Sequence, residues 1–149
     1  MTGFEWPDGA AAAFSFTFDD ARFSQIDTGI PLLNELGVNA TFFVSPAAFE
    51  QRVDQWRQVF EEGHEIAAHT ASHPCSENFA FGRKQSLESM TLEMIRADCE
   101  EADELIRSKI GVKPATFAYP CGQTYVGRGT ETQSYVPVVA ERYRAARSY

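Results

Sequence analysis

Short apolar runs alternate with helical patterns along this chain, and this alternation limits the folds open to it. We predict strands at residues 11–18, 38–44, 65–68, 115–118 and 145–149. Helical spacing of the apolar residues predicts helices at residues 26–36, 55–62, 86–110 and 136–142. Strands that alternate with helices form βαβ units around a parallel sheet. The expected fold class is therefore α/β, with residues 1–149 in a single domain.

Several local signals set the limits of these elements. The small and aromatic residues at 11–18 are typical of a strand buried on both faces of a parallel sheet. Pro31 lies inside the predicted helix at 26–36, so that helix either begins at the proline or kinks there. Ser86 is the expected N-cap of the long helix, and Gly111 predicts its end.

Polar motifs follow the predicted strands. Asp19 and Asp20 end the first apolar run, His69 and His73 come after the strand at 65–68, and a turn begins at Tyr119. Active sites of parallel α/β folds are built at the carboxyl edge of the sheet. We therefore expect these three segments to lie together.

One carboxylate and two imidazoles are a common ligand set for Zn²⁺ or a similar divalent ion. The four-residue spacing of His69 and His73 places both rings on one side if their segment is helical or tightly turned. The second aspartate could then accept a proton from water, so the pattern indicates a metal-dependent hydrolase. The competing interpretations are a helix-capping Asp-Asp pair and ordinary surface histidines. We interpret His64, which precedes the strand, as structural.

The composition of the chain limits the classes of partner that it can bind. The formal net charge is −8, which disfavours contact with nucleic-acid phosphates. A neutral carbohydrate is compatible with this charge. No apolar run reaches the ~20 residues of a membrane span, and the first residues lack a signal-peptide pattern. The chain as given is thus expected in the cytoplasm, or outside it if a leader has been removed.

The three cysteines, Cys75, Cys99 and Cys121, are widely spaced and form no C-x-x-C pair. We interpret them as free thiols in a reducing compartment. Loop aromatics can stack on sugar rings or pack beneath their own loops, and the sequence leaves both alternatives open. They are Phe79, Phe81, Tyr125 and Tyr135.

Three segments together resemble the motifs of a known family, in order and in spacing. They are Thr17-Phe18-Asp19-Asp20, then Gly63-His64-Glu65-Ile66 continuing to His69-Thr70-Ala71-Ser72-His73-Pro74, and Phe117-Ala118-Tyr119-Pro120-Cys121-Gly122. The chain resembles the polysaccharide deacetylases, the nodulation-protein-B-like domain of carbohydrate esterase family 4, over nearly its whole length.

The resemblance implies a distorted (β/α) barrel that holds a divalent metal, usually zinc, and removes acetyl groups from a carbohydrate. It implies that Asp19 is the general base and that Asp20, His69 and His73 bind the metal. A backbone N–H at Cys121 would hold the oxyanion. The third motif would also contribute Tyr119 and Pro120 to substrate binding.

The chain departs from the family pattern in three ways. Ala118 stands where the third motif often carries an arginine that orients the base, and no histidine follows His73 to act as a late general acid. The predicted strands number about five, so we expect an incomplete barrel whose exposed edges a second copy could cover in a homo-oligomer. The alternative function is a metal-containing module that binds glycan without turnover.

Overall fold

The computed structural model describes residues 5–80 and 86–148. Five parallel strands form one sheet in the order β1-β2-β3-β4-β7. Their bounds are β1 Phe16–Asp19, β2 Ala40–Val44, β3 Glu65–Ala68, β4 Thr116–Ala118 and β7 Ala145–Arg147. The sheet curls into a half-barrel, so the prediction of an incomplete (β/α) barrel is confirmed.

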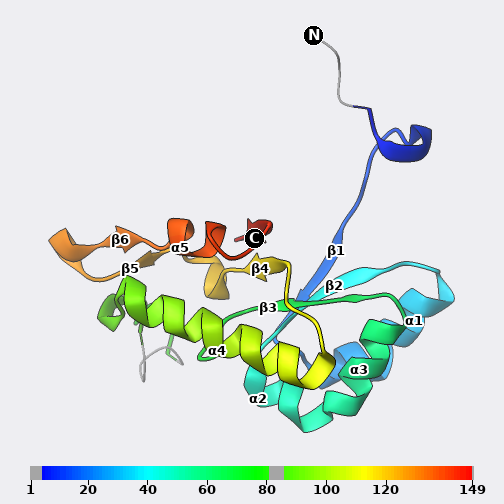
Figure 1. Ribbon diagram of the computed structural model, residues 1–149, viewed down its shortest axis with the longest axis horizontal. Helices are drawn as coiled ribbons and strands as arrows, with labels where there is room; N and C mark the ends of the chain where they lie inside the picture. The colour runs from blue at the N-terminus through cyan, green and yellow to red at the C-terminus, as the bar shows by residue number, and fades with distance from the viewer. Residues whose placement is uncertain (1–4, 81–85, 149) are drawn as a thin grey trace.

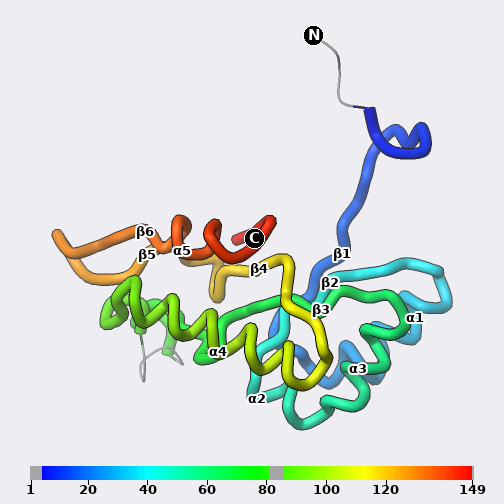
Figure 2. The backbone as a smooth tube through the Cα atoms, in the orientation of Figure 1, coloured from blue at the N-terminus to red at the C-terminus, as the bar shows by residue number. Residues whose placement is uncertain are grey.

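Helices cover one side of this sheet (Figure 1). They are α1 Ile30–Glu35, α2 Pro46–Phe49, α3 Val53–Glu61 and α4 Leu92–Ile110. The short helix α5, Val136–Ala140, precedes β7. A two-stranded antiparallel hairpin, β5 Tyr125–Val126 and β6 Gln133–Ser134, lies between β4 and α5. The trace in Figure 2 shows the N-terminal segment leading away from the sheet before β1.

The buried apolar side chains fall into two main groups. The first core cluster lies under β1, β2 and β3 and contains Phe42, Phe49, Trp56 and Ile66. The second core cluster lies between α4, β4 and α5 and contains Ile95, Phe117, Tyr135 and Tyr143. Parallel strands that pack against helices bury apolar side chains in this way, which contributes most of the favourable free energy of folding.

Two predicted boundaries were wrong. Residues 11–15 are exposed and only Phe16–Asp19 form a strand, because β1 is an edge strand and helices cover only one side of the sheet. The long helix begins at Leu92 rather than near Ser86, because the Thr91 hydroxyl caps it by accepting from the Met94 N–H at 3.2 Å.

Two other sequence signals, a proline and a glycine, mark helix limits that the structure also has. Pro31 lies at the first turn of α1, which follows an irregular π-type turn at Gln25–Gly29. Gly111 ends α4 with a φ of 89°, a left-handed conformation that favours glycine. Both helix limits therefore agree with the prediction.

Candidate metal centre

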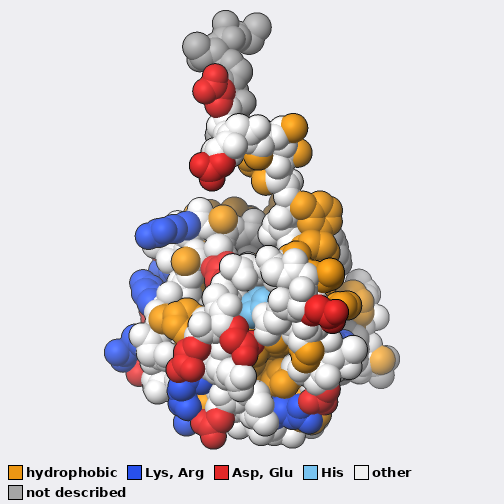
Figure 3. Space-filling view, turned by 90° about the vertical axis from the view of Figure 1, so that its right-hand side faces the viewer, with side chains coloured by type: hydrophobic (Ala, Val, Ile, Leu, Met, Phe, Trp, Pro, Cys, Tyr) orange, Lys and Arg blue, Asp and Glu red, His pale blue; other side chains and the backbone are white. Residues whose placement is uncertain are grey.

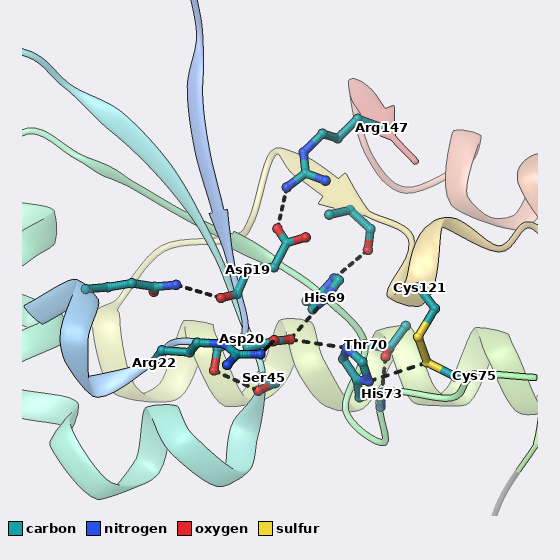
Figure 4. Close-up of polar contacts among 12 residues, drawn as sticks. Asp19, Asp20, Arg22, Ser45, His69, Thr70, His73, Cys75, Cys121 and Arg147 are labelled. Carbon is teal, nitrogen blue, oxygen red and sulfur yellow. Dashed lines mark hydrogen bonds and ion pairs between the residues drawn. A yellow bond between two sulfur atoms is a disulfide. The ribbon is translucent and has the colours of Figure 1, made fainter. Parts of the chain in front are cut away.

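The chain turns sharply where β1 ends. Asp20 has a φ of 75°, and its N–H donates to the Phe43 carbonyl at 3.0 Å. This conformation breaks the alternation of a strand, in which Asp19 and Asp20 would point to opposite faces. Both carboxylates consequently lie at the carboxyl edge of the sheet (Figure 4).

The two histidines lie in a tight turn after β3, not in a helix. Thr70 and His73 both have left-handed backbone angles, with φ of 61° and 51°, and the Thr70 hydroxyl accepts from the His73 N–H at 3.1 Å. Non-glycine residues in this conformation are uncommon and often mark functional sites. The turn brings the two ring centroids to 4.8 Å.

Asp20, His69 and His73 converge on one point. Asp20 Oδ1 lies 3.2 Å from His73 Nε2 and 3.6 Å from His69 Nε2. His69 Nδ1–H donates to the Ala118 carbonyl at 2.8 Å, so Nε2 is the ring nitrogen that faces Asp20, and in the neutral ring its lone pair can bind a metal. Donor atoms at these separations can all reach one ion at the ~2.1 Å typical of zinc–nitrogen and zinc–oxygen bonds. The three residues therefore fit a divalent metal.

The charges of the cluster suit a cation. The pKa of Asp20 lies well below its usual range, chiefly because His69 hydrogen-bonds to the carboxylate, with further lowering by Arg22 and His73 against the opposing effect of burial. Burial also lowers the pKa of His73, and neighbouring His69 lowers it further. Ionised Asp20 and neutral His73 are the protonation states that metal binding requires.

The cluster is accessible from one face of the molecule. His69 is buried, but His73 and Asp20 are 29% and 31% exposed. A substrate can therefore approach the cluster from solvent. Figure 3 shows the face on the right-hand side of Figure 1, where acidic side chains lie beside hydrophobic ones and most Lys and Arg side chains lie toward the margin.

Asp19 lies beside the cluster but outside it. The guanidinium of Arg147, at the end of β7, forms an ion pair with Asp19 Oδ1 (Figure 4). The sequence analysis missed Arg147, because the pairing joins residues 128 positions apart and no local pattern marks it.

A second residue missed from the sequence supports the histidine turn. Asp98 on α4 accepts from the Ser72 N–H at 2.9 Å and from the Ser72 hydroxyl at 3.0 Å. Its carboxylate is largely buried, and burial raises its pKa. An acidic residue on the otherwise apolar face of a predicted helix, between Ile95 and Ala102, was the signal available in the sequence.

The interpretation of the cysteines was wrong for two of them. Cys75 and Cys121 form a disulfide that joins the histidine segment to the third motif, with their Cα atoms 6.0 Å apart. Wide sequence spacing concealed this pairing, which depends on strands β3 and β4 lying side by side. Cys99 is free and buried, and burial raises the pKa of its thiol to about 12.

The third motif forms a turn at Pro120–Gly122, in which Cys121 has a φ of 54°. The side chains of Tyr119 and Pro120 are buried, so their predicted contact with substrate stays a prediction. The predicted role of the Cys121 backbone also stays a prediction.

His64 is structural, as predicted. Its Nδ1 accepts from the Ala40 N–H at 3.1 Å, and its Nε2 lies 2.9 Å from Asn34 Oδ1. Among the loop aromatics, Tyr135 packs in the second core cluster and donates its hydroxyl to the Gln123 carbonyl. Tyr125 is 59% exposed. Phe81 lies outside the described residues.

A curled parallel sheet with this cluster at its carboxyl edge defines an α/β protein with a candidate metal centre. The family model for polysaccharide deacetylases matches residues 8–134. The chain belongs to the polysaccharide deacetylase family.

Two relatives illustrate the range of this family. The chain is 31% identical over 144 residues to a gellan lyase of a Bacillus species, covering 95% of this chain and 5% of that protein. It is 36% identical over 109 residues to a chitooligosaccharide deacetylase of Sinorhizobium fredii, covering 70% of this chain and 49% of that protein. The chain thus spans less than half the length of either relative.

Solved structures share the fold. The Streptococcus pyogenes deacetylase PplD, in complex with acetate, has a TM-score of 0.69 at 18% identity, covering 90% of this chain and 54% of its own. BA3943 of Bacillus anthracis, a pseudoenzyme of carbohydrate esterase family 4, has a TM-score of 0.67 at 16% identity, covering 89% and 42%. In the described part of the chain, no helix is both long and apolar enough to cross a membrane.

Proposed function

We propose that this chain carries the centre of a divalent-metal-dependent deacetylase, which hydrolyses an N- or O-acetyl group on a carbohydrate and releases acetate. The observation that carries the proposal is the convergence of Asp20, His69 and His73 with a separate carboxylate, Asp19, beside them. Family membership and the named activity of the Sinorhizobium relative support it.

In this proposal Asp20 Oδ1 and the Nε2 atoms of His69 and His73 hold the ion, most simply Zn²⁺. When bound, such an ion polarises the acetyl carbonyl and lowers the pKa of the attacking water, to about 7 in favourable sites. Asp19 accepts the proton of that water at Oδ2, because Arg147 binds Oδ1. The Cys121 N–H is the proposed donor to the oxyanion.

Zinc titration tests the first part of this proposal. Calorimetry on metal-stripped protein should give one site with a Kd below about 1 μM, and His73→Ala should abolish it. The matched control is His64→Gln, which changes the histidine at the opposite end of β3 and should leave binding intact. No binding by folded wild-type protein, or equal binding by His73→Ala, would contradict the proposed centre.

Acetate release tests the second part. On acetylated chitooligosaccharides, Asp19→Asn should lower kcat by roughly 10²–10⁴-fold, because it removes the general base. The same variant should still bind Zn²⁺, since Asp19 lies outside the ligand cluster. An unchanged rate would remove Asp19 from the chemistry.

A second candidate is a metal-containing module that binds glycan without turnover. The placement of His64 favours this function. Of the three histidines in the given sequence, two are the proposed metal ligands, and hydrogen bonds to Ala40 and Asn34 hold His64 at the amino end of β3. None of the three is therefore placed to act as a general acid at the cluster. Chitooligosaccharide binding by zinc-loaded protein without acetate release would select this function.

We also propose that the protein works in an oxidising compartment, in contrast to the cytoplasmic expectation. The Cys75–Cys121 disulfide supports this, because disulfides persist in such environments and are rare in a reducing cytosol. Thiol titration of denatured protein, purified without reductant, should detect Cys99 alone. Three reactive thiols would contradict the proposal.

A further inference from the structure

Arg147 reaches the candidate centre from the opposite edge of the sheet. It is the last residue of β7, whereas Asp19 is the last residue of β1, and these two strands are opposite edges of the five-stranded sheet. Their ion pair therefore spans the open, concave face of the half-barrel. To cross this face from β7 to β1, the arginine side chain needs space that no other side chain fills.

Small side chains provide that space. Phe43, Ala67 and Ala118 form a separate buried cluster on the inner face, and the Arg147 guanidinium carbon lies 4.8 Å from the centre of the Phe43 ring. A cation above an aromatic face is attracted to it, so Phe43 holds the guanidinium in place. The methyl groups of Ala67 and Ala118 leave room above the strands between Phe43 and β7. An open groove of about 780 Å³ runs along this face and is lined in part by Phe43 and Arg147.

The register of β4 and β7 places position 118 directly beside Arg147. Ala118 on β4 and Arg147 on β7 are partners in the parallel pair. A side chain at position 118 would therefore start one strand away from Arg147 and at the same height. Arg147 thus reaches the inner face from the strand next to the one that carries Ala118.

Asp19 is held at two points. Its carboxylate Oδ1 pairs with Arg147, and its backbone carbonyl accepts from Gln25 Nε2. The ion pair restricts the rotation of the side chain, and the Gln25 hydrogen bond holds the backbone from which that side chain extends. Oδ2 remains as the oxygen that the proposed proton transfer needs.

We propose that Arg147 is the positioning residue for Asp19: its guanidinium, brought across the inner face from β7, fixes the orientation of the Asp19 carboxylate toward the candidate metal centre. This inference rests on the proposed deacetylase function. The competing role is a purely structural one, in which the ion pair only ties β7 to the opposite edge of the sheet.

The first test separates kcat from KM. With zinc-loaded protein and acetylated chitohexaose, Arg147→Ala should lower kcat by about 10²-fold, the loss expected when a reacting group is misplaced by ~1 Å. KM should change by less than about threefold, because the arginine does not bind the substrate. Zinc affinity, measured by calorimetry, should be retained. Arg144→Ala, which removes an exposed arginine three residues earlier, is the matched control and should leave kcat unchanged.

The second test moves the arginine. The double variant Ala118→Arg/Arg147→Ala returns a guanidinium to the inner face from β4 and should restore kcat to within about tenfold of wild type. A purely structural tie between β7 and β1 would not be restored in this way, because residue 118 belongs to another strand. Urea unfolding midpoints of all variants show whether any loss reflects unfolding.

The outcomes separate the two proposals. Loss of kcat in Arg147→Ala with recovery in the double variant supports the positioning role. Equal rates for wild type and Arg147→Ala, or a folded double variant that recovers nothing, would overturn that role and leave the deacetylase proposal intact. A zinc-loaded wild type that releases no acetate would overturn the deacetylase function and, with it, the role of Arg147.

Discussion

The two core clusters of this protein are stabilised in different ways. The first consists almost entirely of apolar and aromatic side chains, with Trp56 packed against Phe42 and Phe49 at centroid distances of 5.4 and 6.5 Å. The second includes two buried tyrosines, Tyr135 and Tyr143, that donate hydrogen bonds. The disulfide lies next to the second cluster, because Cys121 follows the buried Tyr119 and the Cys75 carbonyl accepts from the Leu87 N–H.

The two clusters differ in how strictly their interactions fix the positions of the side chains. Apolar burial depends on area and volume and has no preferred direction, whereas a buried hydrogen bond or ion pair requires each partner in one position. The candidate centre lies where the two regions meet, with Asp20 and His69 after strands of the first and Ala118 and Arg147 from strands next to the second. The first cluster should therefore respond to lost volume and the second to lost partners.

The largest effect is expected from Trp56→Ala in the first cluster. Trp56 is fully buried, and truncation of a buried aromatic side chain lowers the free energy of unfolding by about 3–5 kcal/mol. Urea unfolding measures this change. Leu36→Ala is the control, because Leu36 is 65% exposed and its loss should cost less than about 0.5 kcal/mol. A similar small cost for both variants would contradict the view of this cluster as volume-dependent.

Loss of the disulfide is the next largest effect. The bond closes a segment of 46 residues, and removing it with Cys75→Ala/Cys121→Ala should lower the free energy of unfolding by about 3 kcal/mol. A dithiol reductant should shift wild type toward the same midpoint. Cys99→Ala should respond to the reductant as wild type does, since Cys99 is not paired. A wild-type midpoint unaffected by reduction would contradict the prediction.

Asp103 tests the need for partners in the second region. Its carboxylate accepts from the Tyr143 hydroxyl at 2.8 Å and from Arg142 at 2.9 Å. Asp103→Ala should lower the free energy of unfolding by about 2 kcal/mol, because the buried tyrosine hydroxyl loses its acceptor. Tyr143→Phe should cost less in the Asp103→Ala background than in wild type. Strictly additive effects would show that this pair is not coupled.

The smallest effect is a pH dependence at Asp98. Burial raises its pKa above the ordinary value of 3.8, so the folded state binds more protons than the unfolded state as the pH rises from there. The contribution of Asp98 to stability should therefore fall with rising pH through this window, up to its folded pKa. Asp98→Asn keeps a similar shape without the charge, so the stability of wild type relative to this variant should decline over the same range. Urea unfolding across a pH series measures the difference, and a constant difference would contradict the assignment.

Local signals predicted the regular elements well. β3 has the predicted limits, and α3, β4, α5 and β7 differ from theirs by a few residues, since their apolar spacing matches the burial they undergo. The start of α4 was missed, because Ser86 and Thr91 are both acceptable caps and only the fold selects one. β1 was predicted too long, because its composition does not reveal that it is an edge strand.

The sequence by itself determined the order of strands and helices and the three segments that meet at the carboxyl edge of the sheet. Periodicity and short motifs encode these features, since they depend on residues a few positions apart. Only the tertiary structure decided that Cys75 pairs with Cys121, that Asp98 supports the histidine turn, and that Arg147 reaches Asp19. Each of these contacts joins residues distant in the chain, and the curl and register of the sheet, rather than any local pattern, bring them within reach of one another.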